Sequence, residues 1–409
     1  MLEMEVNFMK YVMMIGDGMA DATLPQLNGK TPLESLDLPH FNILAGSEHG
    51  TARTVPEGVP AGSDTAILNI FGYDPRTYFT GRSVLEAAGV GVLLNEGEVS
   101  FRMNLCAVEN GVMLSHNGGG VEGDDAEGLM QALVQDPGFQ KAAQALSLHI
   151  HISRTFRHFG VIYAPDAGEF ILKEPHNILD EKWEPYLPAG ALAKEMTALM
   201  LESYRFLDQH PINQARRARG KLPANLLWPW GAGRASRLPS FKEKYGHSGA
   251  VVSAVPLVRG IAKLAGLPAP EVEGANGELD TNYAGKVNAA LASLKSGDDF
   301  AVIHVEAPDE MSHAGDLEKK LEAIRRLDRL VIAPLLEELP KIDRDFRILL
   351  LSDHPTLMTT RTHNGSPVPF AIYDSRNPGA PRKFSESSAL SGPSLANGDL
   401  LMPRLFEQE

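Results

Sequence analysis

The sequence contains a single cysteine, Cys106, and therefore cannot form an internal disulfide or a thiolate metal cluster. This scarcity is typical of a chain that works in a reducing cytoplasm, and we interpret Cys106 as a small buried hydrophobic residue. Basic residues are also outnumbered, since 52 Asp and Glu stand against 38 Lys and Arg and the formal net charge is -14. Such a charge disfavours nonspecific binding to nucleic acid and to anionic membranes.

Long hydrophobic runs are missing as well. No apolar segment approaches the roughly 18 residues that a membrane span needs. The first ten residues, MLEMEVNFMK, carry Glu3 and Glu5 where a secretion signal has basic residues. We therefore expect a cytoplasmic protein with no membrane partner and no nucleic-acid partner. The sequence leaves open whether copies of the chain form a homo-oligomer.

Apolar strands alternate with helical segments over the N-terminal and C-terminal parts of the chain. This alternation predicts an α/β fold in which helices sandwich a mostly parallel sheet. The strand-like runs are YVMMI at residues 11–15, GAVV, FAVIHV and FRILLL, and the main helical segments are DTNYAGKVNAALASLKSG and LEKKLEAIRRLDRLVIAPLLEEL.

The middle of the chain has a different pattern. With 409 residues the chain exceeds the roughly 250 to 300 that one core usually holds, and residues 95–180 are richer in short β-like pieces and turn residues. We predict that residues 1–94 and 181–409 form one discontinuous core domain. Residues 95–180 are predicted to form a smaller inserted α+β domain that binds substrate. We interpret the polar helical stretch 189–220 as the return passage to the core.

Carboxylate and imidazole side chains follow the expected core strands. In a mostly parallel sheet, functional residues gather at the carboxyl ends of the strands, so we expect these side chains to meet at one sheet edge. Within APDEMSH, Asp309 and His313 are four residues apart, which places both side chains on one face of a helical turn. Pro308 suits the start of that turn. The six residues are Asp17, Asp309, His313, Asp353, His354 and His363.

A plainer interpretation exists for each of these residues, because a lone Asp after a strand is more often a turn former or a helix cap. An Asp at each of three strand ends, with a His close to two of them, is difficult to attribute to turn chemistry alone. The combination predicts a site for two divalent ions. Mixed oxygen and nitrogen ligands favour Mn²⁺ or Zn²⁺ over a sulfur-loving ion, and Mg²⁺ is less suited to imidazole.

Ser63 is the candidate nucleophile. It stands in the Gly- and Pro-rich segment EGVPAGSDTAILNIFGYDP, just before an apolar helix expected over residues 65–71. Taken alone, this segment favours Ser63 as the N-cap of that helix. A hydroxyl beside a divalent cation, however, loses its proton near neutral pH and can attack phosphorus. The helix N-terminus would then stabilise the phosphate that the serine acquires.

A set of ordered motifs extends over nearly the whole chain. They are GDGMAD (16–21), GKTPLE (29–34), PAGSDTAILNIFGYDP (60–75), TGRSVLEAAGVGV (80–92), FRMNL (101–105), PSFKEKYG (239–246), DTNY (280–283), APDEMSHAGD (307–316) and DHPTLMTTRTHNGSPVPF (353–370). In this order they resemble the 2,3-bisphosphoglycerate-independent phosphoglycerate mutases, in the archaeal-type branch of the alkaline phosphatase superfamily. The resemblance implies an alkaline-phosphatase-like core, two metal ions with Mn²⁺ expected, and the interconversion of 3- and 2-phosphoglycerate in glycolysis and gluconeogenesis without 2,3-bisphosphoglycerate.

The resemblance also implies roles for individual residues. Ser63 matches the position of the family's phosphoserine nucleophile, which takes the phosphoryl group from 3-phosphoglycerate and returns it to the 2-hydroxyl. By motif position, one ion is held by Asp309, His313 and His363, and the other by Asp17, Ser63, Asp353 and His354. The candidate substrate contacts for carboxylate and phosphate are Arg82, Arg102, Arg154, Arg157, His158, His176 and Lys244.

Two segments depart from the archaeal pattern. MLSHNGGGVEG at 113–123 stands where a basic DRRAGR-like segment is expected, and DHPT with RTHNGSPVPF replaces DHST and a Lys before the His. These variants look like a bacterial subgroup suspected of phosphorylating homoserine. A phosphotransferase of the same fold that acts on a small alcohol such as homoserine is therefore the alternative. A metal-stabilised binding protein without turnover is the third interpretation.

Overall fold

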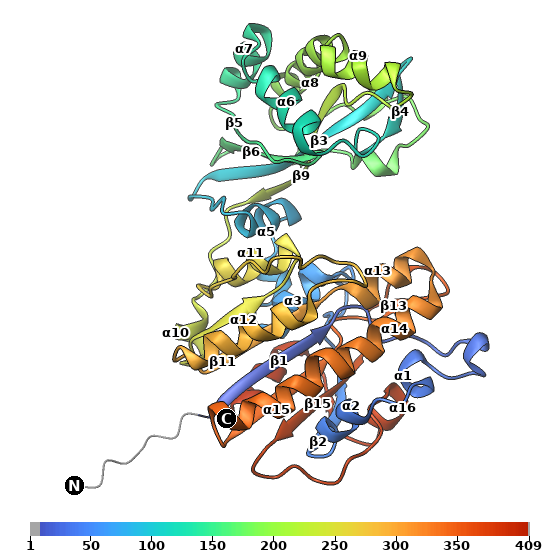
Figure 1. Cartoon of the computed structure of the whole chain (residues 1–409). Helices are drawn as coiled ribbons and strands as arrows, with labels where there is room; N and C mark the ends of the chain where they lie inside the picture. Colours follow the sequence, from blue (N-terminus) through green and yellow to red (C-terminus); the bar gives the residue numbers. More distant parts are fainter. Residues whose placement is uncertain (1–8, 408–409) are drawn as a thin grey trace. The chain divides into compact units, whose positions relative to one another are not determined.

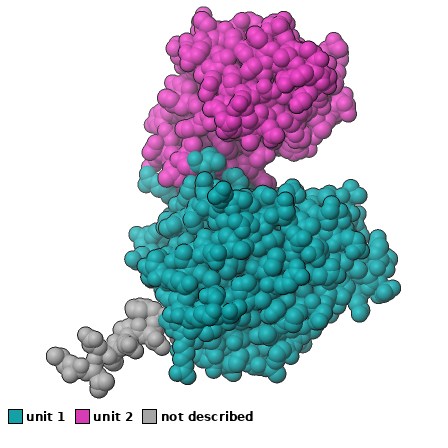
Figure 2. All heavy atoms as spheres, in the orientation of Figure 1, with its two compact units in different colours: residues 1–79, 88–90, 237–409 teal, residues 80–87, 91–236 magenta. Residues whose placement is uncertain are grey.

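The structure is a computed structural model that describes residues 9–407 (Figure 1). The N-terminal segment with Glu3 and Glu5, on which the leader prediction depends, lies outside the described residues. The described chain divides into two units (Figure 2). Unit 1 holds the residues up to 79, 88–90 and those from 237 onward, and unit 2 holds residues 80–87 and 91–236. Within residues 9–407, no helix is long and apolar enough to cross a membrane.

A seven-stranded sheet forms the centre of unit 1, with the strand order β10-β11-β1-β12-β15-β2-β16. Strand β15 is antiparallel to its two neighbours, and the other neighbouring pairs are parallel. The sheet confirms the strands predicted from the apolar runs. Its members are β1 (Lys10–Gly16), β2 (Glu48–Ala52), β10 (Gly249–Val252), β11 (Phe300–Val305), β12 (Phe346–Leu351), β15 (Val368–Asp374) and β16 (Ser394–Leu395).

Helices cover this sheet and explain why its strands are apolar at successive positions. Val12 and Met14 of β1 pack into one core with α12 (Tyr283–Lys295), α14 (Leu317–Leu327) and α15 (Ala333–Ile342), which lie in front of the sheet in Figure 1. The alternate residues of β1 point to the opposite face, and they are buried as well. Burial on both faces is typical of parallel sheets in α/β proteins, and it confirms the predicted fold class.

The segment LEKKLEAIRRLDRLVIAPLLEEL forms α14 and α15, with a π-helical turn at Asp328–Ile332 between them. The predicted helix is therefore present with one irregular turn. The other helices of unit 1 are mostly short. They are α1 (Pro32–Ser35), α2 (Pro39–Leu44), α3 (Ser63–Ile70), α4 (Pro75–Tyr78), α10 (Phe241–Tyr245), α11 (Pro256–Leu264), α13 (Ala307–Ala314), α16 (Glu386–Ala389) and α17 (Leu401–Phe406).

Unit 2 is built on an antiparallel sheet around the long strand β3 (Glu98–Glu109). Strand β3 pairs with β4 (Val112–Ser115), β6 (Arg157–Tyr163) and β9 (Leu226–Arg234), and β6 pairs with β5 (His149–His151). A separate short pair joins β7 (Phe170–Ile171) to β8 (Ala189–Gly190). The helices are α5 (Arg82–Gly89, in this unit up to residue 87), α6 (Gly123–Leu133), α7 (Pro137–Ala145), α8 (Ala193–Asp208) and α9 (Pro211–Ala218).

Unit 2 reaches further along the chain than the predicted inserted domain of residues 95–180. Helix α8 buries Met196, Leu199 and Leu207 in the core of unit 2. Strand β9 pairs with β3 along the strand as far as Cys106, which lies opposite Leu226. The stretch 189–220 is therefore part of unit 2 and not a return passage to the other core. The predicted boundary at residue 180 is wrong because an amphipathic helix shows that it has a buried face without showing which core that face joins.

Candidate metal centre

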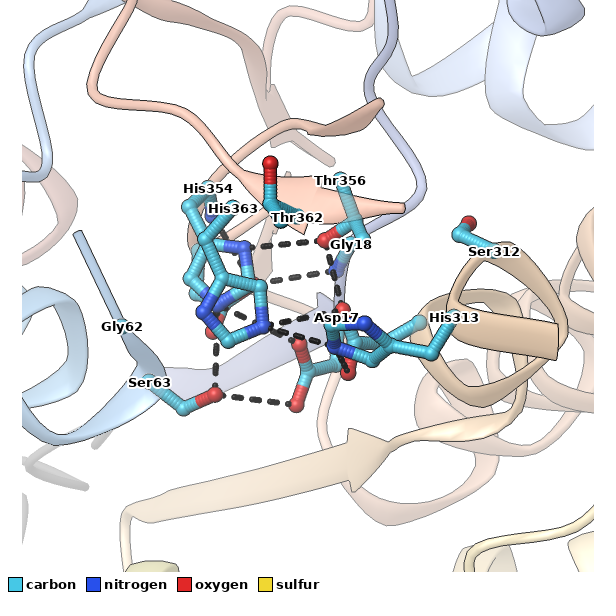
Figure 3. Close-up of polar contacts among 12 residues, drawn as sticks. Asp17, Gly18, Gly62, Ser63, Ser312, His313, His354, Thr356, Thr362 and His363 are labelled. Atoms are coloured by element: carbon cyan, nitrogen blue, oxygen red, sulfur yellow. Dashed lines mark hydrogen bonds and ion pairs between the residues drawn. The ribbon is translucent and has the colours of Figure 1, made fainter. Parts of the chain in front are cut away.

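The six candidate ligands come together at one edge of the unit 1 sheet, and Figure 3 shows Asp17, His313, His354 and His363 among them. Strand β1 lies between β11 and β12 and is parallel to both, so the carboxyl ends of the three strands adjoin. Their positions are as follows: Asp17 after β1, Asp309 and His313 in α13 after β11, Asp353 and His354 after β12, and His363 in β14 (Thr362–His363), which pairs with β13 (Thr356–Leu357).

Asp309 lies against two imidazoles. Its Oδ2 is 3.2 Å from Nε2 of His313, its Oδ1 is 3.5 Å from Nε2 of His363, and the two Nε2 atoms are 2.9 Å apart. The Asp309 carboxylate raises the pKa of His313 to about 9. Nδ1 of His313 lies 2.8 Å from the carbonyl oxygen of Arg361, which only accepts hydrogen bonds. Nδ1 therefore carries a proton, and in a neutral ring the lone pair of Nε2 faces Asp309 and His363.

The second group surrounds His354, which is fully buried. Its Nε2 is 3.2 Å from Oδ2 of Asp353 and 3.7 Å from Oδ1 of Asp17. The ligand atoms of Asp309, His354 and His363 all lie within 4.8 Å of one another, and so do those of Asp17, Asp353 and His354. His354 belongs to both triads.

Two buried carboxylate oxygens at this site, Oδ1 of Asp17 and Oδ2 of Asp353, have no hydrogen-bond partner among residues 9–407. Burial, together with the carboxylates of Asp353 and Asp309, raises the pKa of Asp17 well above its ordinary value. Uncompensated buried charge is costly, and a divalent cation would offset it. The donor set of three carboxylates and three imidazoles fits Mn²⁺ or Zn²⁺. The residues present therefore fit a site for divalent ions.

Ser63 faces the second group. Its hydroxyl lies 3.2 Å from Nε2 of His354 and donates a hydrogen bond to Oδ2 of Asp17 at 3.5 Å, as Figure 3 shows. Helix α3 begins at Ser63 itself, and Gly62 is the N-cap. The interpretation of Ser63 as the N-cap is therefore wrong, and the predicted helix start at residue 65 is two residues late. Because the serine does not cap the helix, its hydroxyl is available to the site at the helix N-terminus.

The position after Asp17 in the GDG segment requires a glycine, Gly18. Its backbone N–H donates to Oδ1 of Asp353 at 3.1 Å, and its φ of +61° lies in the left-handed region that favours glycine. An added Cβ would stand 2.6 Å from Oδ1 of Asp309 and equally close to Oγ1 of Thr356. The chain can pass this closely between the ligands because residue 18 has no side chain.

Sequence reasoning missed several residues that hold the ligands. His304 lies fully buried in β11, where Nε2 is 3.1 Å from Oδ2 of Asp17, and burial lowers its pKa to about 3. Thr356 donates to Oδ1 of Asp309 at 2.5 Å. The available signal for His304 was one polar side chain in the otherwise apolar run FAVIHV. Thr356 had no such signal, since its partner lies 47 residues away in the chain.

A buried ion pair joins the loops on either side of the site. Lys320 of α14 and Asp21 are both fully buried, and their charged atoms are 2.8 Å apart. Nζ of Lys320 also donates to the carbonyl oxygen of Thr356 at 2.7 Å, and Asp21 accepts from the N–H of Met358 at 3.2 Å. The second Asp of GDGMAD is thus bound to lysine and backbone and is not one of the candidate ligands.

Several of the candidate substrate contacts lie in unit 2 around one buried carboxylate, that of Glu86. Arg102 forms two hydrogen bonds with Glu86, one of them at 2.8 Å, and its guanidinium lies 4.3 Å over the Trp230 ring. Arg82 donates to Glu86 at 3.0 Å, and a nitrogen of Arg157 is 3.7 Å from it. Three guanidinium groups thus share one carboxylate, which leaves this cluster with a net positive charge.

The structure groups the other candidate contacts of unit 2 differently. The ring of His176 lies 5.4 Å from that of Trp230, beside the arginine cluster. Arg154 is exposed and pairs with Asp124 and Glu127. His158 is buried, accepts a hydrogen bond from a backbone N–H, and its pKa is lowered to about 4 by burial. Arg154 and His158 do not take part in the arginine cluster.

Lys244 does not join the candidate ligands. Its amine lies 5.8 Å from the centre of the Tyr73 ring and 5.3 Å from that of Tyr245. Tyr245 donates to the carbonyl oxygen of Phe71, just past the end of α3. Ser63 is at the opposite end of this eight-residue helix, about 12 Å away along its axis.

The fold and the site together define an α/β protein with a candidate two-ion centre beside a serine hydroxyl. A family model described as 2,3-bisphosphoglycerate-independent phosphoglycerate mutase matches residues 45–213. A relative with that name from Methanosarcina acetivorans is 42% identical over 388 residues, which cover 94% of this chain and 96% of the relative. The chain therefore belongs to the 2,3-bisphosphoglycerate-independent phosphoglycerate mutase family, which confirms the resemblance and shows that the protein is an enzyme.

Solved structures agree with this assignment. A cofactor-independent phosphoglycerate mutase from Thermoplasma acidophilum aligns with a TM-score of 0.66 and 26% sequence identity. The alignment covers 98% of this chain and 99% of that chain. A protein from Pyrococcus horikoshii aligns with a TM-score of 0.79 and 29% identity over 99% of both chains. The likeness extends over both units and not only over the segment that the family model matches.

Proposed function

We propose that this enzyme interconverts 3-phosphoglycerate and 2-phosphoglycerate without 2,3-bisphosphoglycerate, through a phosphoserine at Ser63. The observation that carries the proposal is the position of the Ser63 hydroxyl, at the N-terminus of α3 and 3.2 Å from His354 in a buried group of candidate ligands. The mutase name of relatives that match more than nine tenths of the chain supports the same reaction.

Two divalent ions, with Mn²⁺ expected, are part of the proposal. When bound, they supply positive charge that favours the alkoxide form of the serine and balances the charge on the phosphate oxygens. In the proposed assignment, Asp309, His313 and His363 would hold one ion, and Asp17, Ser63, Asp353 and His354 would hold the other. The unpartnered oxygens of Asp17 and Asp353 support this assignment, as does the 2.9 Å separation of the facing imidazole nitrogens of His313 and His363.

The protein's own groups carry the proposed transfer. Ser63 Oγ attacks phosphorus, and the bond between phosphorus and the 3-oxygen of the glycerate breaks. The N-terminus of α3 stabilises the phosphate on the serine. The 2-hydroxyl of the same glycerate then attacks phosphorus and releases Ser63. In the first step the proton of Ser63 passes to the departing 3-oxygen, and in the second step the proton of the 2-hydroxyl passes back to Ser63. The balance therefore requires neither water nor a nucleotide, since one phosphoryl group leaves one oxygen of the glycerate and returns to another.

We propose that the arginine cluster of unit 2 binds the anionic groups of the substrate. Arg157 is the strongest candidate because its side chain is partly exposed and its nearest carboxylate oxygen, on Glu86, is 3.7 Å away. Arg102 is buried and already bound to Glu86, so it holds the carboxylate and adds charge to the cluster. Arg82 and His176 complete the proposed set. Arg154, His158 and Lys244 are not included, since their contacts place them outside this cluster.

Transfer of phosphate to a small alcohol such as homoserine is the second candidate. The observation that favours it is His116, which the segment 113–123 places with its ring 6.0 Å from that of His176. Burial lowers the pKa of His116, so this segment adds a neutral ring and no guanidinium to the face that we propose for the substrate. An enzyme whose acceptor is not a phosphorylated acid needs less positive charge there.

The test uses metal-depleted protein, Mn²⁺ and 3-phosphoglycerate without 2,3-bisphosphoglycerate, and it follows the formation of 2-phosphoglycerate. We expect turnover in the wild type and a loss of about a thousand-fold or more in Ser63→Ala. Ser296→Ala, which removes an exposed hydroxyl at the end of α12, is the control and should keep full activity. If the wild type forms no 2-phosphoglycerate but phosphorylates homoserine with a nucleotide donor, the second candidate replaces the first.

A further inference from the structure

Three neighbouring strands of the unit 1 sheet place polar residues in one line behind the candidate metal centre. Strands β10, β11 and β1 are adjacent and parallel. Ser253 directly follows β10, His304 lies near the end of β11 opposite Ile15, and Asp17 directly follows β1. All three residues are buried, with exposed fractions of 5%, 0% and 2%.

These residues are joined through both nitrogens of one imidazole. Nε2 of His304 is 3.1 Å from Oδ2 of Asp17, and Nδ1 is 3.1 Å from Oγ of Ser253. Ser253 in turn accepts a hydrogen bond from the N–H of Val255 at 3.0 Å. The ring is therefore held at both ends, and the hydroxyl that holds it is itself held by the backbone.

The direction of the hydrogen bonds follows from what each group can do. Asp17 as a metal ligand is ionised, and an ionised carboxylate only accepts hydrogen bonds. In that form Nε2 of His304 carries a proton and donates a hydrogen bond to Asp17. In the tautomer that carries its proton on Nε2, the other ring nitrogen, Nδ1, is an acceptor. Ser253 therefore donates its hydroxyl proton to Nδ1 while it accepts from Val255. Each polar atom of the ring and of the hydroxyl has a partner of the right kind.

The backbone around His304 is also held in place. Lys286, which is buried, donates from Nζ to the carbonyl oxygen of His304 at 3.0 Å. The N–H of Asp17 donates to the carbonyl oxygen of Val305, the next residue of β11, at 3.0 Å. The ring of His304 and the carboxylate of Asp17 are thus attached to backbone segments whose relative register is set by the sheet.

We propose that His304 is a positioning residue for the metal centre, and that Ser253 orients its ring. The Nε2–H group holds Oδ2 of Asp17, which would leave Oδ1, an atom without a hydrogen-bond partner in the described part of the chain, to bind the ion. Partners of this kind orient ligands and tune metal affinity. The inference rests on the proposed two-ion function.

The chain offers a matched control in a second buried histidine. His49 lies in β2 of the same sheet and is 2% exposed. Its ring stacks on Phe384 with the ring centres 5.2 Å apart, and neither of its nitrogens has a hydrogen-bond partner within residues 9–407. His49→Phe therefore removes a buried imidazole from the sheet without breaking a hydrogen bond. His304→Phe removes one that links Asp17 to Ser253.

The test measures Mn²⁺ binding to the full chain by isothermal titration calorimetry. We expect His304→Phe to weaken one of the two binding events about ten- to a hundred-fold and to leave the other within about two-fold. His304→Gln, whose amide nitrogen can donate at the position of Nε2, should recover most of the loss, and His49→Phe should bind both ions as the wild type does. Unchanged binding of both ions by His304→Phe would overturn the inference and leave the two-ion proposal intact.

Two further outcomes are separable. If the wild type itself binds no Mn²⁺, the two-ion proposal fails and the role of His304 fails with it. If circular dichroism shows that His304→Phe is unfolded, Ser253→Ala decides, because it keeps the imidazole and removes only the group that orients it. A several-fold loss in one binding event of Ser253→Ala supports the inference, and unchanged binding of both ions contradicts it.

Discussion

At Gly18 the chain passes between ligands that come from different strands, and the residue type follows from that geometry. Its backbone binds Asp353, and the space that a side chain would need is occupied by Asp309 and Thr356. A glycine beside an Asp at a strand end is visible in the sequence. The contacts that require it are not, because its neighbours lie about 290 and 340 residues further along the chain.

The first prediction compares Gly18→Ala with Gly29→Ala. Both glycines have positive φ, +61° and +75°, but an added Cβ meets nothing within 4 Å at Gly29. We expect Gly29→Ala to lower the free energy of unfolding by about 1 kcal/mol, from backbone strain alone. Gly18→Ala should lose more, on the order of 3 kcal/mol, together with Mn²⁺ affinity. Urea unfolding and calorimetry check this, and equal effects of the two changes would contradict the crowding described at Gly18.

Asp17, Asp309 and Asp353 could be predicted from sequence because each comes shortly after an apolar run, and a parallel sheet brings the ends of such runs together. The candidate histidines lie close to two of these carboxylates in the chain. His304 and Lys286 could not be predicted, since their roles depend on which strands and helices become neighbours. The N-cap interpretation of Ser63 failed by a single position. A hydroxyl at the N-cap and one at the first helical residue differ little in sequence, yet only the second leaves the side chain free to face the site.

Helix α14 connects the sheet to the loops of the site through one buried charge. Lys320 reaches Asp21 after β1 and the carbonyl oxygen of Thr356 after β12. The periodicity of LEKKLEAIRRL predicts the helix but gives no reason to bury a lysine. Lys320 can be buried because its charge is paired with Asp21, which lies 299 residues earlier in the chain.

We therefore predict that Lys320→Met destabilises the protein by about 3 to 5 kcal/mol, because it leaves the buried carboxylate of Asp21 without its cation. The double change with Asp21→Asn should recover part of this loss. Lys319→Met is the matched control: this neighbouring lysine is exposed and pairs with Asp316 on the surface, so its loss should cost less than about 1 kcal/mol. Urea unfolding of the four proteins measures these differences, and a similar small cost for both lysines would refute the assigned role.

At the scale of the whole molecule, the chain leaves unit 1, builds unit 2 and returns to complete the central sheet. Strand β1 comes before unit 2, whereas β10, β11 and β12 come after it. The class of the fold could be predicted from the alternation of strands and helices. The extent of unit 2 could not, because the apolar face of α8 and the pairing of β9 with β3 show which core they join only in three dimensions.

The proposed role of unit 2 in the reaction can be tested at Arg157. Arg157→Ala should raise the KM for 3-phosphoglycerate about ten-fold or more, with a smaller effect on kcat, if its guanidinium binds an anionic group of the substrate. Arg219→Ala removes an exposed arginine of the same unit, 3.6 Å from Asp125, and should leave both constants unchanged. Steady-state kinetics with Mn²⁺ decides, and an unchanged KM in Arg157→Ala would remove this residue from the proposed substrate contacts.

The proposed passage of phosphate through Ser63 can be followed with a labelled substrate. The Mn²⁺-loaded protein is mixed with 3-phosphoglycerate that carries a radiolabelled phosphate, quenched in acid during turnover, and digested into peptides. We expect the label on the peptide that contains Ser63, and its transfer to 2-phosphoglycerate when unlabelled substrate is added before the quench. Formation of labelled 2-phosphoglycerate with no label on Ser63 at any time of quenching would show that the phosphoryl group does not pass through this serine.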